Sequence, residues 1–402
     1  MNVGIAHRQI SALLDDYLES FGMNAPQGPL RAMGELTRGI LWTGSVQLSN
    51  AARLFADTPA HLAQAVKRLS IHLADRRWDH RPWAAAILAE QVRHVRRNDL
   101  LPLDATELAK PYARKMQYQT TVRDASRKGQ PLVTGYWCWG AYHWVPSKDR
   151  LTPLILRPYS PEQPLFLSEN DTWVRCFETL REATGGRGIW LQDRGGDRPE
   201  VLSACLRLQS RWVIRIREDR GLIGPDGERR PAGYWADWAL SHLPPRDRAV
   251  ALAVRLPPRD VPQERPPALL WLVTPTYRSA DGERWLLLTR GVVDMDTGPG
   301  PARTDYGLRW HAEDAKRFLG QIWHVERFLV QSFRALERVL WCVVAAGGFQ
   351  ALLQREQTRL AGELEQQVLY WDKPAVIPGY RLARGLQSVA QQTGHVPMLN
   401  NA

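Results

Sequence analysis

Three acidic residues that lie far apart in the chain, Asp104, Asp193 and Glu313, have side chains suited to binding divalent cations. Each aspartate comes at the end of a predicted strand, and Glu313 lies on a predicted helix. In an α/β sheet, functional groups collect at the carboxyl ends of the strands. Carboxylates that converge there repel one another unless a cation bridges them, and their hard oxygens favour Mg²⁺ or Mn²⁺ over zinc. We therefore expect these three side chains to form a metal site.

Two ions about 3.5–4 Å apart would bracket a phosphodiester, one activating the attacking oxygen and the other stabilising the leaving oxygen. Each aspartate alone also has an ordinary explanation. Asp104 could cap the backbone at Thr106 and Glu107, and Asp193 could be a turn residue in Asp193-Arg-Gly-Gly-Asp197. Both explanations stay open at this point.

The helix that carries Glu313 is expected to begin near Tyr306, with Thr304 or Asp305 as its N-cap. Tyr306, Arg309 and Glu313 are three and four residues apart, so they share one face of that helix. A carboxylate beside a guanidinium and a phenol suits metal and phosphate chemistry. The alternative is an amphipathic surface helix in which Arg309 and Glu313 form an ordinary ion pair.

The elements around these residues predict an α/β layer built on a mixed sheet. The predicted strands cover 99–104, 134–145, 151–156, 188–192 and 212–217, and the predicted helices cover 168–183 and 198–208. Residues 146–149 would turn the chain between the second and third strands, which then form an antiparallel hairpin. Residues 219–300 are dense in Pro and Gly and carry further strand-like runs, so we expect a mainly β insertion there.

These patterns divide the chain into five segments. They are an N-terminal helical DNA-binding domain (1–95), the first part of the core (96–218), the β-rich insertion (219–300), the second part of the core with the Glu313 helix (301–350) and a C-terminal helical tail (351–402). Helical structure is expected through about residue 370, and 373–402 are expected to be a loose extension.

The N-terminal segment contains two amphipathic runs, Ser45–Phe55 and Pro59–Leu73, joined by a short turn in which Thr58 is a good N-cap. The second run is basic, and several arginines follow it. This arrangement is compatible with helix-turn-helix contact to DNA. A plain helical bundle with a solvated basic face fits equally well.

The composition points to a polyanionic partner. Of 402 residues, 53 are Lys or Arg and 42 are Asp or Glu, a formal net charge of +11. We find no apolar run of the ~20 residues that a membrane span needs, so nucleic acid is the expected partner and no membrane is involved. The four cysteines form no C-x-x-C pair, which argues against a zinc site or a disulfide framework and favours a reducing, cytoplasmic location.

Three blocks of the sequence resemble the catalytic blocks of bacterial DDE transposases. They are Leu103-Asp104-Ala105-Thr106, Trp190-Leu-Gln-Asp193-Arg-Gly-Gly-Asp197 and Tyr306-x2-Arg309-Trp310-x2-Glu313. The insertion-sequence-four group, marked by Tyr-x2-Arg-x3-Glu-x6-Lys, is the most similar. The separation of the second and third acids, 313 − 193 = 120 residues, leaves room for the β insertion of that group. One position departs from the pattern, because residue 320 is Gly where the pattern has Lys.

The resemblance implies a ribonuclease H-like core and cut-and-paste DNA transposition at insertion-sequence ends. Asp104, Asp193 and Glu313 would hold two Mg²⁺ or Mn²⁺ ions, and Arg309 would neutralise a phosphate. The other DNA contacts would come from Tyr306, Lys316 and Arg317, the last two in place of the missing Lys. The resemblance also implies a homodimer on paired terminal inverted repeats, target DNA as a second substrate, and a bacterial, nucleoid-associated location.

Two other functions fit parts of the sequence. Gly320 motivates a catalytically inactive DNA-binding protein descended from a transposase. The 17 tryptophans could line a sugar cleft in a glycoside hydrolase that uses two of the carboxylates, but the positive charge argues against it. A ribonuclease or resolvase on the same core would not account for the β insertion or the basic N-terminal helices.

Overall fold

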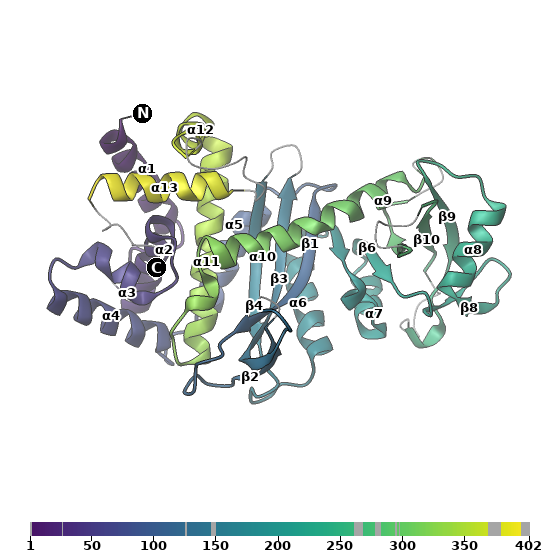
Figure 1. The fold of residues 1–402 in the computed structure, drawn as a ribbon, viewed down its shortest axis with the longest axis horizontal. Helices are drawn as coiled ribbons and strands as arrows, with labels where there is room; N and C mark the ends of the chain where they lie inside the picture. Colours follow the sequence, from purple (N-terminus) through teal and green to yellow (C-terminus); the bar gives the residue numbers. More distant parts are fainter. Residues whose placement is uncertain are drawn as a thin grey trace. The chain divides into compact units, whose positions relative to one another are not determined.

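The computed structural model describes residues 2–25, 27–124, 127–145, 150–260, 268–277, 283–293, 296, 298–368 and 379–394. The chain forms two compact units, each built from separate segments (Figure 1). Unit 1 consists of Met1–Gln91, Ala105–Phe166 and Glu313–Ala402, and unit 2 consists of Val92–Asp104 and Leu167–Ala312. The five-segment division stays a prediction.

Unit 2 is built on a mixed sheet. The first half of β1 (Leu100–Ala109) pairs in parallel with β5 (Ile189–Gln192), which pairs in parallel with β6 (Arg211–Ile216). The order continues through β11 (Leu286–Arg290), β10 (Leu270–Pro275) and β9 (Ala249–Val254), all antiparallel to their neighbours. The mainly β segment therefore extends the sheet past β6 and adds a separate two-stranded ribbon of β7 (Gly221–Ile223) and β8 (Arg229–Pro231).

The helices of unit 2 follow their capping signals. Ser168 accepts a hydrogen bond from the Asp171 N–H at the start of α6 (Glu169–Thr184), and Gly185 ends that helix in the left-handed conformation. On α6, Phe177 stacks on Trp190 of β5, with ring centroids 5.3 Å apart. The helix α7 (Pro199–Arg207) precedes β6, as predicted. A further helix, α8 (Ala232–His242), was not expected inside the mainly β segment.

Unit 1 combines helices from both ends of the chain with an antiparallel hairpin. The hairpin consists of β3 (Leu132–Val145) and β4 (Arg150–Tyr159), flanked by β2 (Thr120–Arg123). The second half of β1 lies beside β3. The predicted turn at 146–149 lies outside the described residues. The helices are α1 (Val3–Glu19), α2 (Gly28–Thr43), α3 (Leu48–Ala52), α4 (Pro59–Ala74), α5 (Arg81–Val92), α10 (His311–Gln321, from Glu313 on), α11 (Phe333–Glu356), α12 (Thr358–Gln366) and α13 (Tyr380–Gln392).

The strand neighbours β4, β3 and β1 in unit 1, and β1, β5 and β6 in unit 2, are those of a ribonuclease H-like core. The predicted α/β fold class, with a mixed sheet and helices at both ends of the chain, is therefore confirmed. In the N-terminal part, the predicted cap is also present, because the Thr58 hydroxyl accepts from the His61 N–H at the start of α4.

The central helix of unit 1 is α11, which contacts β4, α2, α4 and α12. It is long and apolar enough to cross a membrane by length and composition, which the sequence reading did not anticipate, but 83% of its apolar window is buried inside the protein. Ser332 caps it by accepting from the Ala335 N–H. We interpret it as a core helix.

One charged side chain of α11 is completely buried. The Arg338 guanidinium donates hydrogen bonds to the carbonyl oxygens of His72 (3.1 Å), Leu73 (2.7 Å), Asp75 (2.9 Å) and Trp78 (2.6 Å). Its carbon Cζ also lies 4.6 Å from the centroid of the Trp78 ring. Burial lowers the pKa of Arg338 to about 10, so it remains charged at neutral pH. Arg338 thus satisfies the carbonyls that end α4 and fixes the following loop to α11.

Several predicted boundaries were wrong. The strand at Asp104 does not end there, because β1 continues to Ala109 beside β3 and the pairing outweighs the weak strand propensity of Ala105 and Glu107. The Tyr306 helix starts earlier, as α9 (Gly300–Gly307) with Pro301 in its first turn, and a 3₁₀ turn at Leu308–Trp310 separates it from α10. Neither Thr304 nor Asp305 is its N-cap.

The C-terminal part also differs from the prediction. Helical structure is interrupted after Gln321 by a 3₁₀ turn, Val325–Arg327, so it is not one continuous run. The expected loose extension contains α13, which buries Leu382, Leu386 and Val389. Its apolar residues recur at helical spacing, and packing against α2 and α12 orders them. Residues 373–378 and 395–402 lie outside the described residues.

Candidate catalytic site

In unit 2, the strand register brings Asp104 and Asp193 side by side. The parallel pair β1–β5 sets Leu100 beside Ile189 and Pro102 beside Leu191. Continued for two residues, this register sets Asp104 beside Asp193, on strands about 4.8 Å apart. Residues in register on neighbouring strands project to the same face of the sheet. The two aspartates predicted to act together therefore occupy adjacent positions, although β1 itself runs on past Asp104.

The turn after β5 fixes the Asp193 carboxylate. Its Oδ1 accepts a hydrogen bond from the Gly195 N–H at 2.7 Å. A Cβ at position 195 would lie 2.9 Å from that same oxygen, so glycine permits this close approach. Four residues along, the buried Asp197 carboxylate accepts from the Arg217 N–H (2.9 Å) and from Arg220 Nε (2.6 Å). Asp197 therefore fixes the turn to Arg217 and Arg220, and Asp193 occupies the start of the turn, directly after β5.

Arg309 faces Asp104 from the 3₁₀ turn after α9. Its Nη1 lies 3.4 Å from Asp104 Oδ2, and both side chains are largely buried. Tyr306, one helical turn earlier, is also buried. Burial raises the pKa of Tyr306 and Asp193 adds to the rise, whereas Arg309 and Arg215 oppose it. The structure thus places Asp104, Asp193, Tyr306 and Arg309 in unit 2, and their joint role in one site stays a prediction.

Three further residues join this cluster and were missed in the sequence. Arg215 of β6 continues the row of Asp104 and Asp193 by the β5–β6 register, and it forms an ion pair with Glu283. Its Cζ lies 5.9 Å from the Trp285 ring, which meets Tyr306 edge-on with centroids 5.3 Å apart. Hydrogen bonds from Arg215 and Arg194 lower the pKa of Glu283. The available signal was the alternation Trp212-Val-Ile-Arg215-Ile-Arg217, which puts a charge inside a buried strand.

Asp305, beside Tyr306 on α9, is the most perturbed carboxyl group of this region. Burial raises its pKa to about 6, and Arg211 partly opposes the rise. Between about pH 4 and 6 the folded state holds a proton that the unfolded state releases, so stability falls as the pH rises through this window.

We expect Asp305→Asn to stabilise the protein at pH 7.5 and to have little effect at pH 4. The gain should be roughly 1–2 kcal/mol, after allowance for the solvent that reaches this partly exposed side chain. Thermal denaturation of both proteins at the two pH values measures it. Equal differences in melting temperature at both values would contradict burial as the cause.

Glu313, Lys316 and Arg317 lie on α10 in unit 1. Glu313 Oε1 is 3.4 Å from Lys316 Nζ, which also donates to the Ala105 carbonyl oxygen at 3.4 Å. Arg317 lies 3.6 Å from the buried Asp314 carboxylate and is largely exposed. Among the described residues, no group of three or more His, Cys, Asp or Glu side chains is arranged to hold a metal ion. The participation of Glu313 in one site with the two aspartates stays a prediction.

Unit 1 also contains a basic cavity of about 460 Å³. Five arginines line it, together with Asp79, His80 and Glu337. The arginines come from the loop after α4, from α5, from β4 and from α11: Arg76, Arg77, Arg81, Arg157 and Arg334. Burial lowers the pKa of His80 to about 4, so this side chain is neutral and adds no charge at pH 7. The predicted basic N-terminal region is thus part of a cationic surface that also draws on α11.

Trp310 is the most exposed tryptophan among the described residues, with 61% of its surface accessible. It directly follows Arg309 in the 3₁₀ turn. The sequence did not single it out because 17 tryptophans cannot be ranked by type alone. An exposed indole ring offers a flat apolar surface for a planar ligand.

Comparisons with solved structures find a likeness in fold. No family model and no curated protein matches the sequence. The fold is similar to piggyBac transposase in the cryo-EM structure of its synaptic complex with hairpin DNA. That likeness has a TM-score of 0.46 and 10% sequence identity, and covers 93% of this chain and 74% of the other.

Proposed function

We propose that this protein is a DNA transposase of the insertion-sequence-four type, which cleaves DNA at insertion-sequence ends and joins them to target DNA. The observation that carries the proposal is the register that sets Asp104, within β1, beside Asp193, just after the parallel strand β5, with Arg309 and Tyr306 facing them. Glu313 would complete the acidic triad. A net charge of +11 and the arginine-lined cavity support a nucleic-acid substrate.

The donor set fits a hard divalent cation. Two adjacent carboxylates supply oxygen ligands, and Mg²⁺ takes the rest of its shell from water and substrate phosphate. Asp104 and Asp193, with Glu313 by the resemblance, would hold two Mg²⁺ or Mn²⁺ ions. Bound there, the ions would supply an activated water and stabilisation of the leaving oxygen.

The chain's own groups around this position are suited to orienting a phosphodiester. The Arg309 guanidinium already lies beside an oxyanion and can offer two parallel N–H groups to a phosphate. The Tyr306 hydroxyl keeps its proton because its pKa is raised, so it can only donate or accept a hydrogen bond. Lys316 and Arg317 would contact the DNA backbone farther along α10.

A strand-cutting assay tests the proposal. Supercoiled plasmid that carries the inverted repeats flanking the coding region would be incubated with the protein and Mg²⁺ or Mn²⁺, the cations that such oxygen ligands select. We expect nicks or breaks at the repeat ends, and none with Ca²⁺ or a chelator. A protein that binds these ends but never cuts them would instead be the inactive DNA-binding descendant.

Gly320 is the feature that favours this second function, because the signature lysine is missing. Nothing lies within 4 Å of the position that a Cβ would occupy at residue 320, and the residue is exposed near the end of α10. A lysine would therefore fit without a clash.

We expect Gly320→Lys to stabilise the fold by about 0.5–1 kcal/mol, because glycine is a poor helix former. We also expect it to raise affinity for end DNA several-fold by adding a phosphate contact. Gly320→Ala is the matched control, since it improves the helix without adding charge. Urea denaturation and a DNA-binding titration separate the two effects. Equal DNA affinity in both variants would show that position 320 does not face the DNA.

A homodimer on paired ends, and a location at the bacterial nucleoid in the cytoplasm, complete the proposal. Both come from the resemblance of the three acidic blocks. Sedimentation of the protein with and without end DNA would establish whether the dimer forms.

A further inference from the structure

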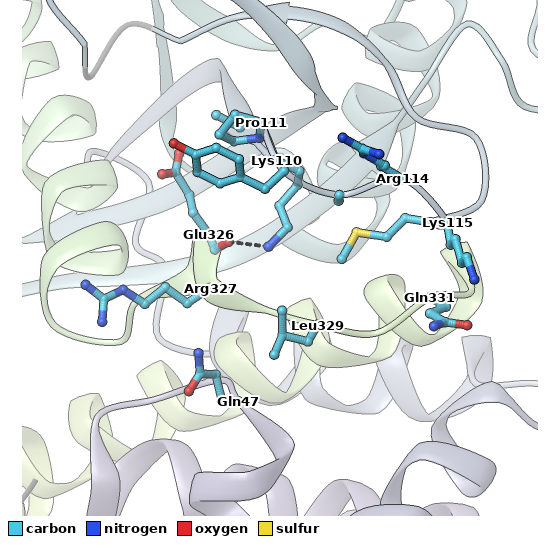
Figure 2. Close-up of a pocket in the computed structure, with 13 residues that line it drawn as sticks. Gln47, Lys110, Pro111, Arg114, Lys115, Glu326, Arg327, Leu329 and Gln331 are labelled. Carbon is cyan, nitrogen blue, oxygen red and sulfur yellow. Dashed lines mark hydrogen bonds between the residues drawn. The ribbon is translucent and has the colours of Figure 1, made fainter.

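Unit 1 contains a second cavity, lined by neither Asp104 nor Asp193 (Figure 2). Its volume is about 590 Å³, within the range of roughly 300–1,000 Å³ that small-molecule sites occupy. Its walls come from the segment after β1, residues 109–116, and the segment between α10 and α11, residues 326–331. Gln47, just before α3, closes another side.

Three cations around this cavity have no acidic partner. Arg114, Lys115 and Arg327 form no ion pair and no side-chain hydrogen bond within the described part of the chain. Figure 2 shows Arg114 and Lys115 on one side of the cavity and Arg327 on the other. Glu326 is the single acidic residue in the lining. Cations gathered around one concave space raise the local concentration of anions.

Lys110 connects the two walls of this cavity. Its Nζ donates to the carbonyl oxygens of Glu326 (2.7 Å) and Phe328 (2.5 Å), and it lies 4.3 Å from the Phe328 ring. Figure 2 shows the bond that joins the two walls. Burial lowers the pKa of Lys110 to about 8. Because Lys110 donates to these two backbone carbonyl oxygens, we assign it a structural role in the cavity wall and not a role in ligand binding.

Two apolar side chains of the lining are exposed to solvent. Tyr112 exposes 83% of its surface and Leu329 exposes 68%. The Arg127 guanidinium lies 5.7 Å from the centroid of the Tyr112 ring, which leaves most of that ring accessible. An accessible aromatic ring next to guanidinium groups is the combination by which proteins hold an unpaired nucleotide, through stacking on the base and ion pairing with the phosphate.

We propose that this cavity binds a nucleoside phosphate, with the phosphate among Arg114, Lys115 and Arg327 and the base against Tyr112 and Leu329. The group could come from an unpaired nucleotide in a DNA strand or from a free nucleotide. This binding needs neither Asp104 nor Asp193. It goes beyond the proposed function, and a test of it succeeds or fails independently of DNA cutting.

The first test uses the full chain and a fluorescein-labelled single-stranded thymidine 12-mer, with binding followed by anisotropy. The double variant Arg114→Gln/Lys115→Gln should bind about ten-fold more weakly at 0.1 M salt. The slope of log affinity against log salt should fall by about 1.4, the value for two lost phosphate contacts on a single strand. The control Arg8→Gln/Arg359→Gln removes the same charge from exposed positions on α1 and α12, and its affinity should stay within two-fold of wild type.

The second test isolates stacking. Tyr112→Ala should weaken binding about ten-fold, whereas Tyr112→Phe, which keeps the ring, should stay within two-fold. An oligonucleotide carrying iododeoxyuridine should crosslink at Tyr112. Competition by AMP would identify a free nucleotide as the ligand, and its failure to compete would identify the strand.

Two results would overturn the proposal. One is the absence of binding by both the 12-mer and AMP. The other is equal loss of duplex and single-strand affinity in the arginine–lysine variant with no effect of Tyr112→Ala, which would mean non-specific surface charge. Melting temperatures of all variants verify that they are folded.

Discussion

Asparagine at position 104 or at position 193 is expected to reduce DNA cutting by at least about 10³-fold while leaving end-DNA binding unchanged, since each change removes a charged ligand from the proposed metal site. Asparagine preserves the shape of either side chain and, at position 193, the hydrogen bond from the Gly195 N–H. Because Asp193 lies in register beside Asp104, loss of its charge also relieves repulsion, so the melting temperature of the position 193 variant should stay equal or rise. The position 104 variant also loses the ion pair with Arg309, so its melting temperature should fall.

Asp197 provides the matched control for that experiment. It lies in the same turn, but its carboxylate is completely buried and bound to Arg217 and Arg220. Asp197→Asn should therefore lower stability, by about 3–5 kcal/mol as for a broken buried ion pair. Assays of cutting, DNA binding and melting on the three variants distinguish the roles. Full cutting by the position 104 or 193 variants would refute the catalytic assignment.

Replacing Arg338 by methionine should destabilise the protein by about 3–5 kcal/mol. Four carbonyl oxygens would lose their donor at once, two of them at the end of α4, and the Trp78 ring would lose its cation. Arg338→Lys should fall between wild type and methionine, because an ammonium group cannot reproduce the planar fork that reaches four oxygens.

Arg334 is the control on the same helix, one turn earlier. Within the described residues, its side chain donates only to the Arg76 carbonyl oxygen, in an exposed position, at 3.3 Å. Arg334→Met should cost less than about 1 kcal/mol. Urea denaturation followed by circular dichroism measures both. If Arg338→Met were no more destabilising than Arg334→Met, the four hydrogen bonds would not be what holds α4 to α11.

Local signals in the sequence were sufficient for most elements of the core. The capped helix after Ser168 and the strand before Asp193 follow from residue types within a few positions. The strand through Asp104 did not, because its second half is stabilised by pairing with β3, some 25 residues away. Tertiary pairing of this kind overrides strand propensity and cannot be read from a local window.

The candidate site likewise combines residues that a local motif indicates with residues that only the tertiary structure reveals. Asp104, Asp193 and Arg309 could be predicted from the sequence because each belongs to a spaced motif, and their roles stay predictions. Arg215 and Glu283 belong to none, and only the β5–β6 register and the ion pair reveal them. The strands of the mainly β segment were expected, but their addition to the edge of β6 depends on partner choice, which alternating patterns do not encode.

The core of unit 1 joins residues from both ends of the chain, with Leu36 of α2 and Leu386 of α13 in one apolar cluster. During synthesis, the ribosome must add 386 − 36 = 350 residues after Leu36 before this partner exists. At about 5–20 residues per second, that takes roughly 20–70 s. Throughout that interval the apolar surface of the nascent N-terminal helices is uncovered. We therefore expect chaperones that act at the ribosomal exit tunnel to bind these helices.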